Sequence, residues 1–339
     1  MDVTDGGETS RGAPRDDSPV APPTLPRSGT APLRRPAPLV GVSLTGFAMG
    51  VAEVVPGFSG GTVALVAGIY ERLVVAVRTA VHGLALLLRG RVRPAAAALL
   101  SVDWVFVIVL GTGMLLALFT AARPLQRLIE DYPAEVSATF LGLVLGAALV
   151  AVRHLHHPSA RHAVLVVVTA VAAFAVLGLR PEGFDDPGLG VIFAAAAVAV
   201  CAWILPGVSG SFLLLVLGVY PAVVGALSER DLVVVGVVAA GCVVGLAAFS
   251  TALSWLLARA HDVVIAVLIG VMAGSVRVLW PWPSDAGLGS AELAAPPGVE
   301  ALLAAALALA AFATVWILGL AAGAVERFAA RRSAARQDP

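Results

Sequence analysis

The chain has 339 residues, of which 59% are hydrophobic and 13% are charged, with 22 basic and 22 acidic side chains. So few charges cannot cover the surface of a soluble domain of this length, which excludes an ordinary water-soluble protein and predicts an all-α polytopic membrane protein. Two cysteines, Cys201 and Cys242, lie in apolar stretches and are interpreted as small core residues.

Both ends of the chain are polar. Residues 1–36 are rich in Pro, Arg, Asp and Ser and cannot bury enough apolar surface to fold, so we predict a disordered cytoplasmic tail. No short apolar core with a cleavage site follows a basic start, which argues against a signal peptide. Residues 327–339 are predicted to form a second cytoplasmic tail.

Between the tails lie apolar segments long enough to cross a bilayer, which requires about 20 residues. Two apolar regions, 39–80 and 188–227, are interrupted by Pro56-Gly57-Phe58-Ser59-Gly60 and Pro206-Gly207-Val208-Ser209-Gly210. Each region could be two crossings or a hairpin that leaves by the face it entered; the uncharged turn favours a re-entrant hairpin. Six uninterrupted stretches are predicted to be transmembrane helices, at residues 104–122, 134–152, 163–179, 232–257, 263–280 and 299–325.

Loop charges and internal identities together predict an inverted repeat. Arginines in short loops mark the cytoplasmic side and place both chain ends there, with Arg123 and Arg127 in an external loop. Each hairpin is followed by three helices, so the second repeat (181–326) is inverted relative to the first (37–180). Seven residues recur 150 positions later, from Pro56 and Pro206 to Tyr70 and Tyr220. Each half also has a Gly-xxx-Gly helix that permits close packing, at Gly142 and Gly146 and at Gly270 and Gly274.

The two turns carry the chemistry of an anion site. Proline ends the incoming helix, glycine permits positive φ, and a serine can cap the outgoing helix, whose first N–H groups then point at the tip. One such turn could equally be a simple kink, but two copies favour a site. The predicted turn or hinge residues are Pro56, Gly57, Pro206 and Gly207. The predicted phosphate-binding residues are Ser59, Gly60, Gly61, Thr62, Ser209, Gly210 and Ser211.

Other polar residues have competing interpretations. Glu53, three residues before Pro56, is a candidate for ion coupling or for orienting the tip, with a structural strut as the alternative. Arg277 could draw in an anion or extend toward the membrane surface, and the second is favoured. The histidines at 154, 156, 157 and 162 lie in a basic loop without acidic partners, so we predict a solvated loop and no metal site.

The stretch from Met49 to Thr62, continuing through Gly68-Ile69-Tyr70-Glu71-Arg72, resembles the bacterial polyprenyl-phosphate transporter family. Pro206-Gly207-Val208-Ser209-Gly210-Ser211-Phe212 and Gly218-Val219-Tyr220 match that family's second motif, and the resemblance covers about residues 39–325. Glu53 departs from the Asp expected there. The resemblance implies a plasma-membrane transporter, not an enzyme, that returns undecaprenyl phosphate from the outer to the inner leaflet for cell-envelope synthesis. Protons or another ion could drive it.

Two alternatives remain at this stage. An undecaprenyl-pyrophosphate phosphatase would require an arginine directly after the turn serine and a pair of glutamates, whereas Gly60 and Gly210 follow Ser59 and Ser209. We therefore predict no catalytic residues. A secondary transporter of a small anion is the other alternative. We expect no cofactor and no nucleic-acid partner, and the sequence does not determine the oligomeric state.

Overall fold

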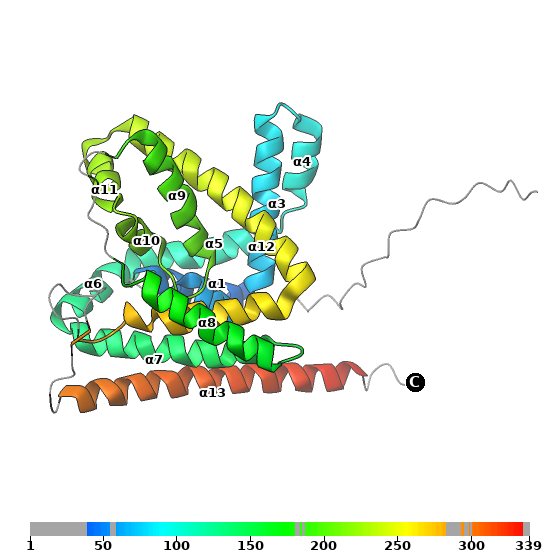
Figure 1. Ribbon diagram of the computed structural model, residues 1–339. Helices are drawn as coiled ribbons and strands as arrows, with labels where there is room; N and C mark the ends of the chain where they lie inside the picture. The colour runs from blue at the N-terminus through cyan, green and yellow to red at the C-terminus, as the bar shows by residue number, and fades with distance from the viewer. Residues whose placement is uncertain are drawn as a thin grey trace, which may run out of the picture. The chain divides into compact units, whose positions relative to one another are not determined.

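The computed structural model describes residues 39–54, 59–179, 184, 187–282, 293–294, 298 and 300–334 (Figure 1). For residue 300 and residues 321–334 it describes the backbone only. The described residues belong to one structural unit, Pro38–Pro339. Every element in this part of the chain is a helix, which confirms the all-α prediction. The predicted tail at residues 1–36 lies outside the described residues.

The first half of the chain forms eight α-helices and one short 3₁₀ turn. They are α1 (Leu39–Val54), α2 (Gly60–Val66), α3 (Tyr70–Leu88), α4 (Val92–Leu100), α5 (Trp104–Thr120), α6 (Ala122–Asp131), α7 (Pro133–Ala151), η1 (Val152–His154) and α8 (Ala160–Val176). The second half begins in the same way, with a long helix, a seven-residue helix and a third helix. Its elements are α9 (Leu189–Ile204), α10 (Gly210–Val216), α11 (Tyr220–Glu229), α12 (Leu232–Gly274), η2 (Ser275–Arg277) and α13 (Glu300–Ala334).

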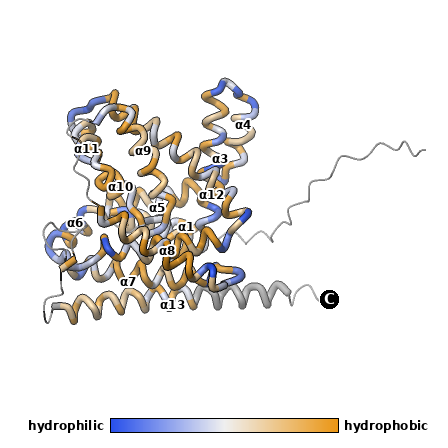
Figure 2. The backbone as a smooth tube through the Cα atoms, viewed as in Figure 1, coloured by the Kyte–Doolittle hydropathy of each residue, from blue (hydrophilic) through white to orange (hydrophobic). Residues whose placement is uncertain are grey.

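Several helices satisfy the length and composition of a membrane span. Three segments do so alone, at Pro133–His154, Leu232–Arg277 and Ala301–Leu320. Two bent pairs raise the number to five, α4 with α5 at 68° and α10 with α11 at 114°. The chain is therefore a multi-pass membrane protein. Figure 2 shows the apolar colour along these helices, with hydrophilic residues at α6, at the tip of α3 and α4, and where α11 meets α12.

Helix α12 contains a break where the sequence predicts two separate spans. Its 43 residues would extend about 65 Å as one straight helix, roughly twice the apolar thickness of a bilayer. Ala260 has non-helical angles, φ −143° and ψ 50°, and divides the segment between the predicted spans 232–257 and 263–280. The polar residues at 259, 261 and 262 mark this break in the sequence.

Two connections that were expected to be irregular are helical instead. Helix α3 continues to Leu88, beyond the predicted hairpin end at residue 80, and α4 packs against it after a turn at Gly90, where φ is +71°. The external loop predicted around Arg123 and Arg127 is α6. The apolar run of α4, Ala95–Leu100, is too short to span a bilayer, and charged residues interrupt α6. A search for membrane-spanning apolar runs therefore finds neither helix.

Glycines allow the main helix pairs to pack closely. Figure 1 shows α13 alongside α7, and a Cβ atom at Gly142 of α7 would overlap the Ala308 carbonyl group of α13. In α12, a Cβ atom at Gly270 would lie 2.7 Å from the Val166 carbonyl oxygen of α8. The predicted Gly-xxx-Gly contacts are confirmed for both helices.

Helices α2 and α10 end in the same type of cap. The Gly68 N–H donates to the Leu65 carbonyl at 3.1 Å, and the Ile69 N–H donates to Ala64 at 3.0 Å. In the second copy, Gly218 donates to Leu215 at 2.9 Å and Val219 donates to Leu214 at 3.1 Å. Both glycines adopt positive φ, 69° and 72°, as this helix ending requires. The internal sequence identities thus correspond to matching local structures.

Candidate functional site

Thr62, in the first turn of α2, contacts the second Pro-Gly break, 145 residues further along the sequence. The Gly207 N–H of the second break donates to the Thr62 hydroxyl oxygen in the first turn of α2, at 3.0 Å. Thr62 and Gly207 are both buried. A buried N–H group without an acceptor is costly, so this bond holds the second turn against α2.

Close backbone packing surrounds this hydrogen bond. A Cβ atom at Gly61 would lie 2.7 Å from the Ile204 carbonyl oxygen at the end of α9, so a side chain would force the two breaks apart. Gly207 has φ +86°, and a Cβ atom there would lie 2.7 Å from Cα of Met272 in α12. This confirms the predicted need for glycine at Gly207. Pro56 and Gly57, the predicted residues of the first turn, lie outside the described residues.

The N-terminus of α2 has acceptors from its own chain. Ser59 adopts an extended conformation and its hydroxyl accepts from the Gly61 N–H at 3.1 Å, as predicted for a capping serine. The Glu53 carboxylate at the end of α1 accepts from the Gly60 N–H at 2.9 Å. Glu53 thus places a negative group where an incoming anion would bind, at the positive end of α2. The sequence prediction of open N–H groups at this tip is wrong for Gly60 and Gly61.

The N-terminus of α10 differs. Ser209 lies at the capping position with φ −92° and ψ 134°, but its side chain makes no capping bond, contrary to the prediction. The Ser209 hydroxyl instead forms a hydrogen bond with the Ser211 hydroxyl, at 2.9 Å. Within the part of the chain that the structure describes, the Gly210 and Ser211 amides have no protein acceptor. Trp203 occupies the position equivalent to Glu53, so no carboxylate reaches this tip from the preceding helix.

Arg277 lies beside α8, near the second turn. Its guanidinium carbon is 4.8 Å from the centre of the Phe174 ring, and a Cβ atom at Gly178 would overlap the guanidinium group. The next residue, Val278, packs in one apolar cluster with Val208 and Phe212. Helix α2, the second Pro-Gly break and Arg277 therefore belong to neighbouring parts of the fold, and a hydrogen bond joins α2 to the break.

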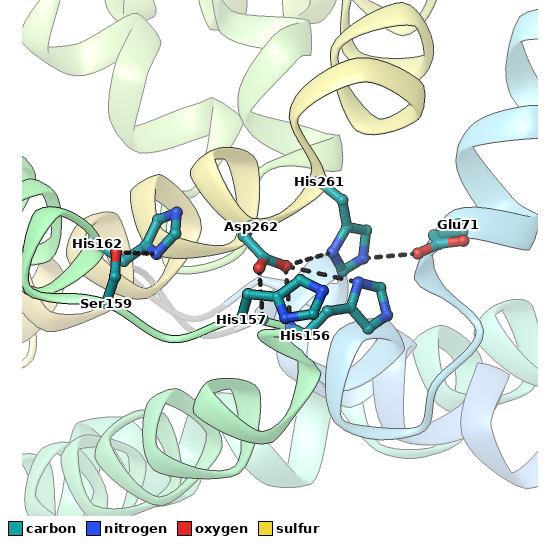
Figure 3. Close-up of polar contacts among 7 residues, drawn as sticks. All are labelled: Glu71, His156, His157, Ser159, His162, His261 and Asp262. Atoms are coloured by element: carbon teal, nitrogen blue, oxygen red, sulfur yellow. Dashed lines mark hydrogen bonds and ion pairs between the residues drawn. The ribbon is translucent and has the colours of Figure 1, made fainter.

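The histidine loop has acidic partners that the sequence prediction missed. Figure 3 shows His156 and His157 beside Asp262, with Glu71 on the far side of His261. Asp262 accepts the His156 and His157 N–H groups at 3.0 and 2.7 Å. The interpretation of a loop without acidic partners is therefore wrong. Asp262 lies 106 residues from His156 and 105 from His157 in the sequence, so local pattern could not reveal this contact.

A family model described as VCA0040-like, undecaprenyl phosphate translocase-like, matches residues 49–292. The matched residues include both breaks and the helices between them. The chain belongs to this undecaprenyl phosphate translocase-like family. The resemblance drawn from the two Pro-Gly motifs is thus confirmed.

Two curated relatives of this translocase-like chain have the same name. A polyprenyl-phosphate transporter of Vibrio cholerae is 35% identical over 239 residues, which are 70% of this chain and 77% of the relative. A polyprenyl-phosphate transporter of Staphylococcus aureus is 28% identical over 266 residues, 70% of this chain and 85% of the relative. No solved structure gives a significant match.

Proposed function

We propose that this protein is a transporter that returns undecaprenyl phosphate, or a closely related polyprenyl phosphate, from the outer to the inner leaflet of the bacterial plasma membrane. Family membership and the names of the two relatives support the lipid class. The observation that carries the proposal is the hydrogen bond between Thr62 and Gly207, because it joins the two broken segments at one place. Sites of secondary transporters form where such breaks meet.

The proposed architecture is an inverted repeat. Residues 37–180 and 181–326 each comprise a re-entrant hairpin, at 39–80 or 188–227, followed by three transmembrane helices. The 150-residue offset between α2 and α10, and their matching caps at Gly68 and Gly218, support the repeat. Loop arginines place both termini in the cytoplasm. The two hairpins would then approach the membrane centre from opposite faces.

The lipid phosphate is proposed to bind at the two tips while its polyprenyl chain stays in the bilayer. In the second tip, the Gly210 and Ser211 amides and the hydroxyls of Ser209 and Ser211 are suited to an oxyanion. In the first, the Gly60 and Gly61 amides would become available once the Glu53 carboxylate and the Ser59 hydroxyl release them. The hydroxyl groups of Ser59 and Thr62 would be further donors. Arg277 would add positive charge near the second tip.

Glu53 is proposed to couple transport to protons. Its carboxylate and a lipid phosphate would compete for the Gly60 N–H group, because both are anions drawn to the N-terminus of α2. Protonation of Glu53 would weaken its bond to Gly60 and favour the phosphate. Release of the phosphate would then allow Glu53 to lose its proton and to accept again from the Gly60 N–H group.

The decisive experiment is translocation in proteoliposomes. The purified chain is reconstituted with labelled undecaprenyl phosphate, and movement between leaflets is followed with and without a pH gradient. We expect protein-dependent movement that the gradient accelerates. Movement equal to that of protein-free vesicles would contradict the proposal. Release of inorganic phosphate from undecaprenyl pyrophosphate, measured on the same preparation, would indicate an enzyme instead, for which the glycines after Ser59 and Ser209 provide no arginine.

A further inference from the structure

Three distant segments of the chain bring nitrogen and carboxylate groups together away from the Pro-Gly breaks. His156 lies in the connection between η1 and α8, His261 and Asp262 directly follow the break of α12 at Ala260, and Glu71 lies in the first turn of α3 (Figure 3). Nothing in the proposed transport step uses these residues.

The donor atoms are spaced as they would be around one small cation. Asp262 Oδ1 lies 3.1 Å from His261 Nδ1 and 3.6 Å from His156 Nδ1. One donor atom from each of the three residues can be chosen so that all lie within 4.8 Å of one another. Zinc bonds of about 2.0–2.1 Å in tetrahedral geometry separate neighbouring donors by roughly 3.3 Å. We propose that His156, His261 and Asp262 form a binding site for a divalent transition metal of the Zn²⁺ type.

The surrounding hydrogen bonds restrain Asp262 and His261. The Glu71 carboxylate lies 3.0 Å from His261 Nε2, the carboxylate–histidine arrangement that commonly fixes a metal-binding ring. If Nε2 donates its proton to Glu71, Nδ1 presents a lone pair to the Asp262 oxygen, and a cation between these two atoms relieves their repulsion. The N–H groups of His156 and His157 hold Asp262 in place.

The site is accessible from solvent, and its charge suits a cation. The His156 side chain is 67% exposed, whereas those of His261 and Asp262 are 20% and 14% exposed, so one side is open and the other is held by the fold. A cavity of about 490 Å³ is lined by these residues and by His157, His162 and Arg259. The Arg259 guanidinium lies over the Trp255 ring at 4.9 Å, which gives it a partner apart from the three ligands. Water or an exchangeable ligand would complete the coordination.

A bound metal would connect three segments that are distant in the sequence. It would hold the break of α12 to the connection before α8 through His156, and to α3 through Glu71 and His261. Helix α3 follows α2 directly, and α12 packs on the second turn through Met272. The site is therefore suited to restrain movement between the two halves from outside the lipid site. Metal binding concerns residues separate from the Pro-Gly breaks and does not depend on the transport proposal, whereas the restraint on movement rests on it.

The test is a Co²⁺ titration of the full-length protein, purified in detergent through a tag without histidine. Co²⁺ bound by these nitrogen and oxygen donors gives a visible absorption band. We expect saturation at one Co²⁺ per chain, displacement by Zn²⁺, and loss of the band in His156→Ala and His261→Ala. An absorption band that survives both substitutions, or no band in the unmodified protein, would overturn the proposal.

Two further variants keep the test independent of folding. His82→Ala removes an exposed histidine on α3 that makes none of these contacts. This variant should bind Co²⁺ as the unmodified protein does. Glu71→Gln leaves the three ligands intact and should weaken binding by about 10- to 100-fold. Zn²⁺ should also raise the melting temperature of the unmodified protein but not that of His261→Ala. Equal stabilisation of both proteins would contradict a site at His261.

Discussion

At the scale of single residues, Glu53 determines what occupies the N-terminus of α2. The sequence marked it as an acidic residue in an apolar helix, but its partner could not be predicted, because the Gly60 amide lies seven residues away across a turn. The geometry gives Glu53 a defined role as an internal acceptor. A neutral side chain would imitate its protonated form.

Glu53→Gln is expected to transport without responding to the pH gradient, because no charge is left to be neutralised. Glu53→Asp is the matched control and should keep the pH response with a lower rate, since its shorter side chain must reach the same Gly60 amide. The measurement is the initial rate of translocation at several pH values in proteoliposomes. A Gln variant with the pH profile of the unmodified protein would show that Glu53 is only a strut.

Thr62 offers a second test at this scale. Thr62→Val removes the hydroxyl and leaves the buried Gly207 N–H without its acceptor, which should lower the free energy of unfolding by about 1–3 kcal/mol. Thr62→Ser keeps the hydroxyl and should stay close to the unmodified protein. Denaturant unfolding in detergent measures the free energy of unfolding of both variants. If Thr62→Val proved as stable as Thr62→Ser, the bond between the two breaks would contribute little.

At the scale of helices, glycine contacts determine which pairs can approach. Gly142→Ala should disrupt the packing of α7 on α13, because the new Cβ atom would overlap the Ala308 backbone. We expect destabilisation of about 1–3 kcal/mol. Gly236→Ala on α12 is the matched control, since no atom lies within 4 Å of its added Cβ, and alanine favours a helix there. Thermal unfolding should separate the two variants, and equal melting temperatures would argue against close packing at Gly142.

Much of this helical arrangement could be predicted from local sequence. The Pro-Gly breaks, the break near Ala260 and the Gly-xxx-Gly contacts each follow from residues close together in the chain. The end of α3 after residue 80, α4 and α6 escaped prediction, because their apolar runs are short or interrupted by charged residues. The predicted cap at Ser209 is absent because the Ser209 hydroxyl forms a hydrogen bond with the Ser211 hydroxyl instead. The cluster around Asp262 depends on tertiary contacts alone, which no local pattern encodes.

At the scale of the whole molecule, the proposed inverted topology has a direct test. Ser159 and Ser228 are exposed residues that the topology places in the cytoplasm and outside the cell, respectively. After Cys201 and Cys242 are replaced by Ala, a membrane-impermeant maleimide should label Ser228→Cys in intact cells and Ser159→Cys only after lysis. Labelling of both positions from outside would exclude the proposed topology. A cysteine-free protein is the control for background labelling.

The bond between Thr62 and Gly207 would also make the two halves of the proposed inverted repeat unequal. The residue equivalent to Thr62, 150 positions later, is Phe212, which has no hydroxyl group. A conformation that exchanged the roles of the two halves would therefore lose this bond without forming its counterpart. A difference of about 1 kcal/mol corresponds to roughly a fivefold ratio of populations. If the proposed halves exchange roles during transport, this bond would favour one resting orientation even before any ion or lipid is bound.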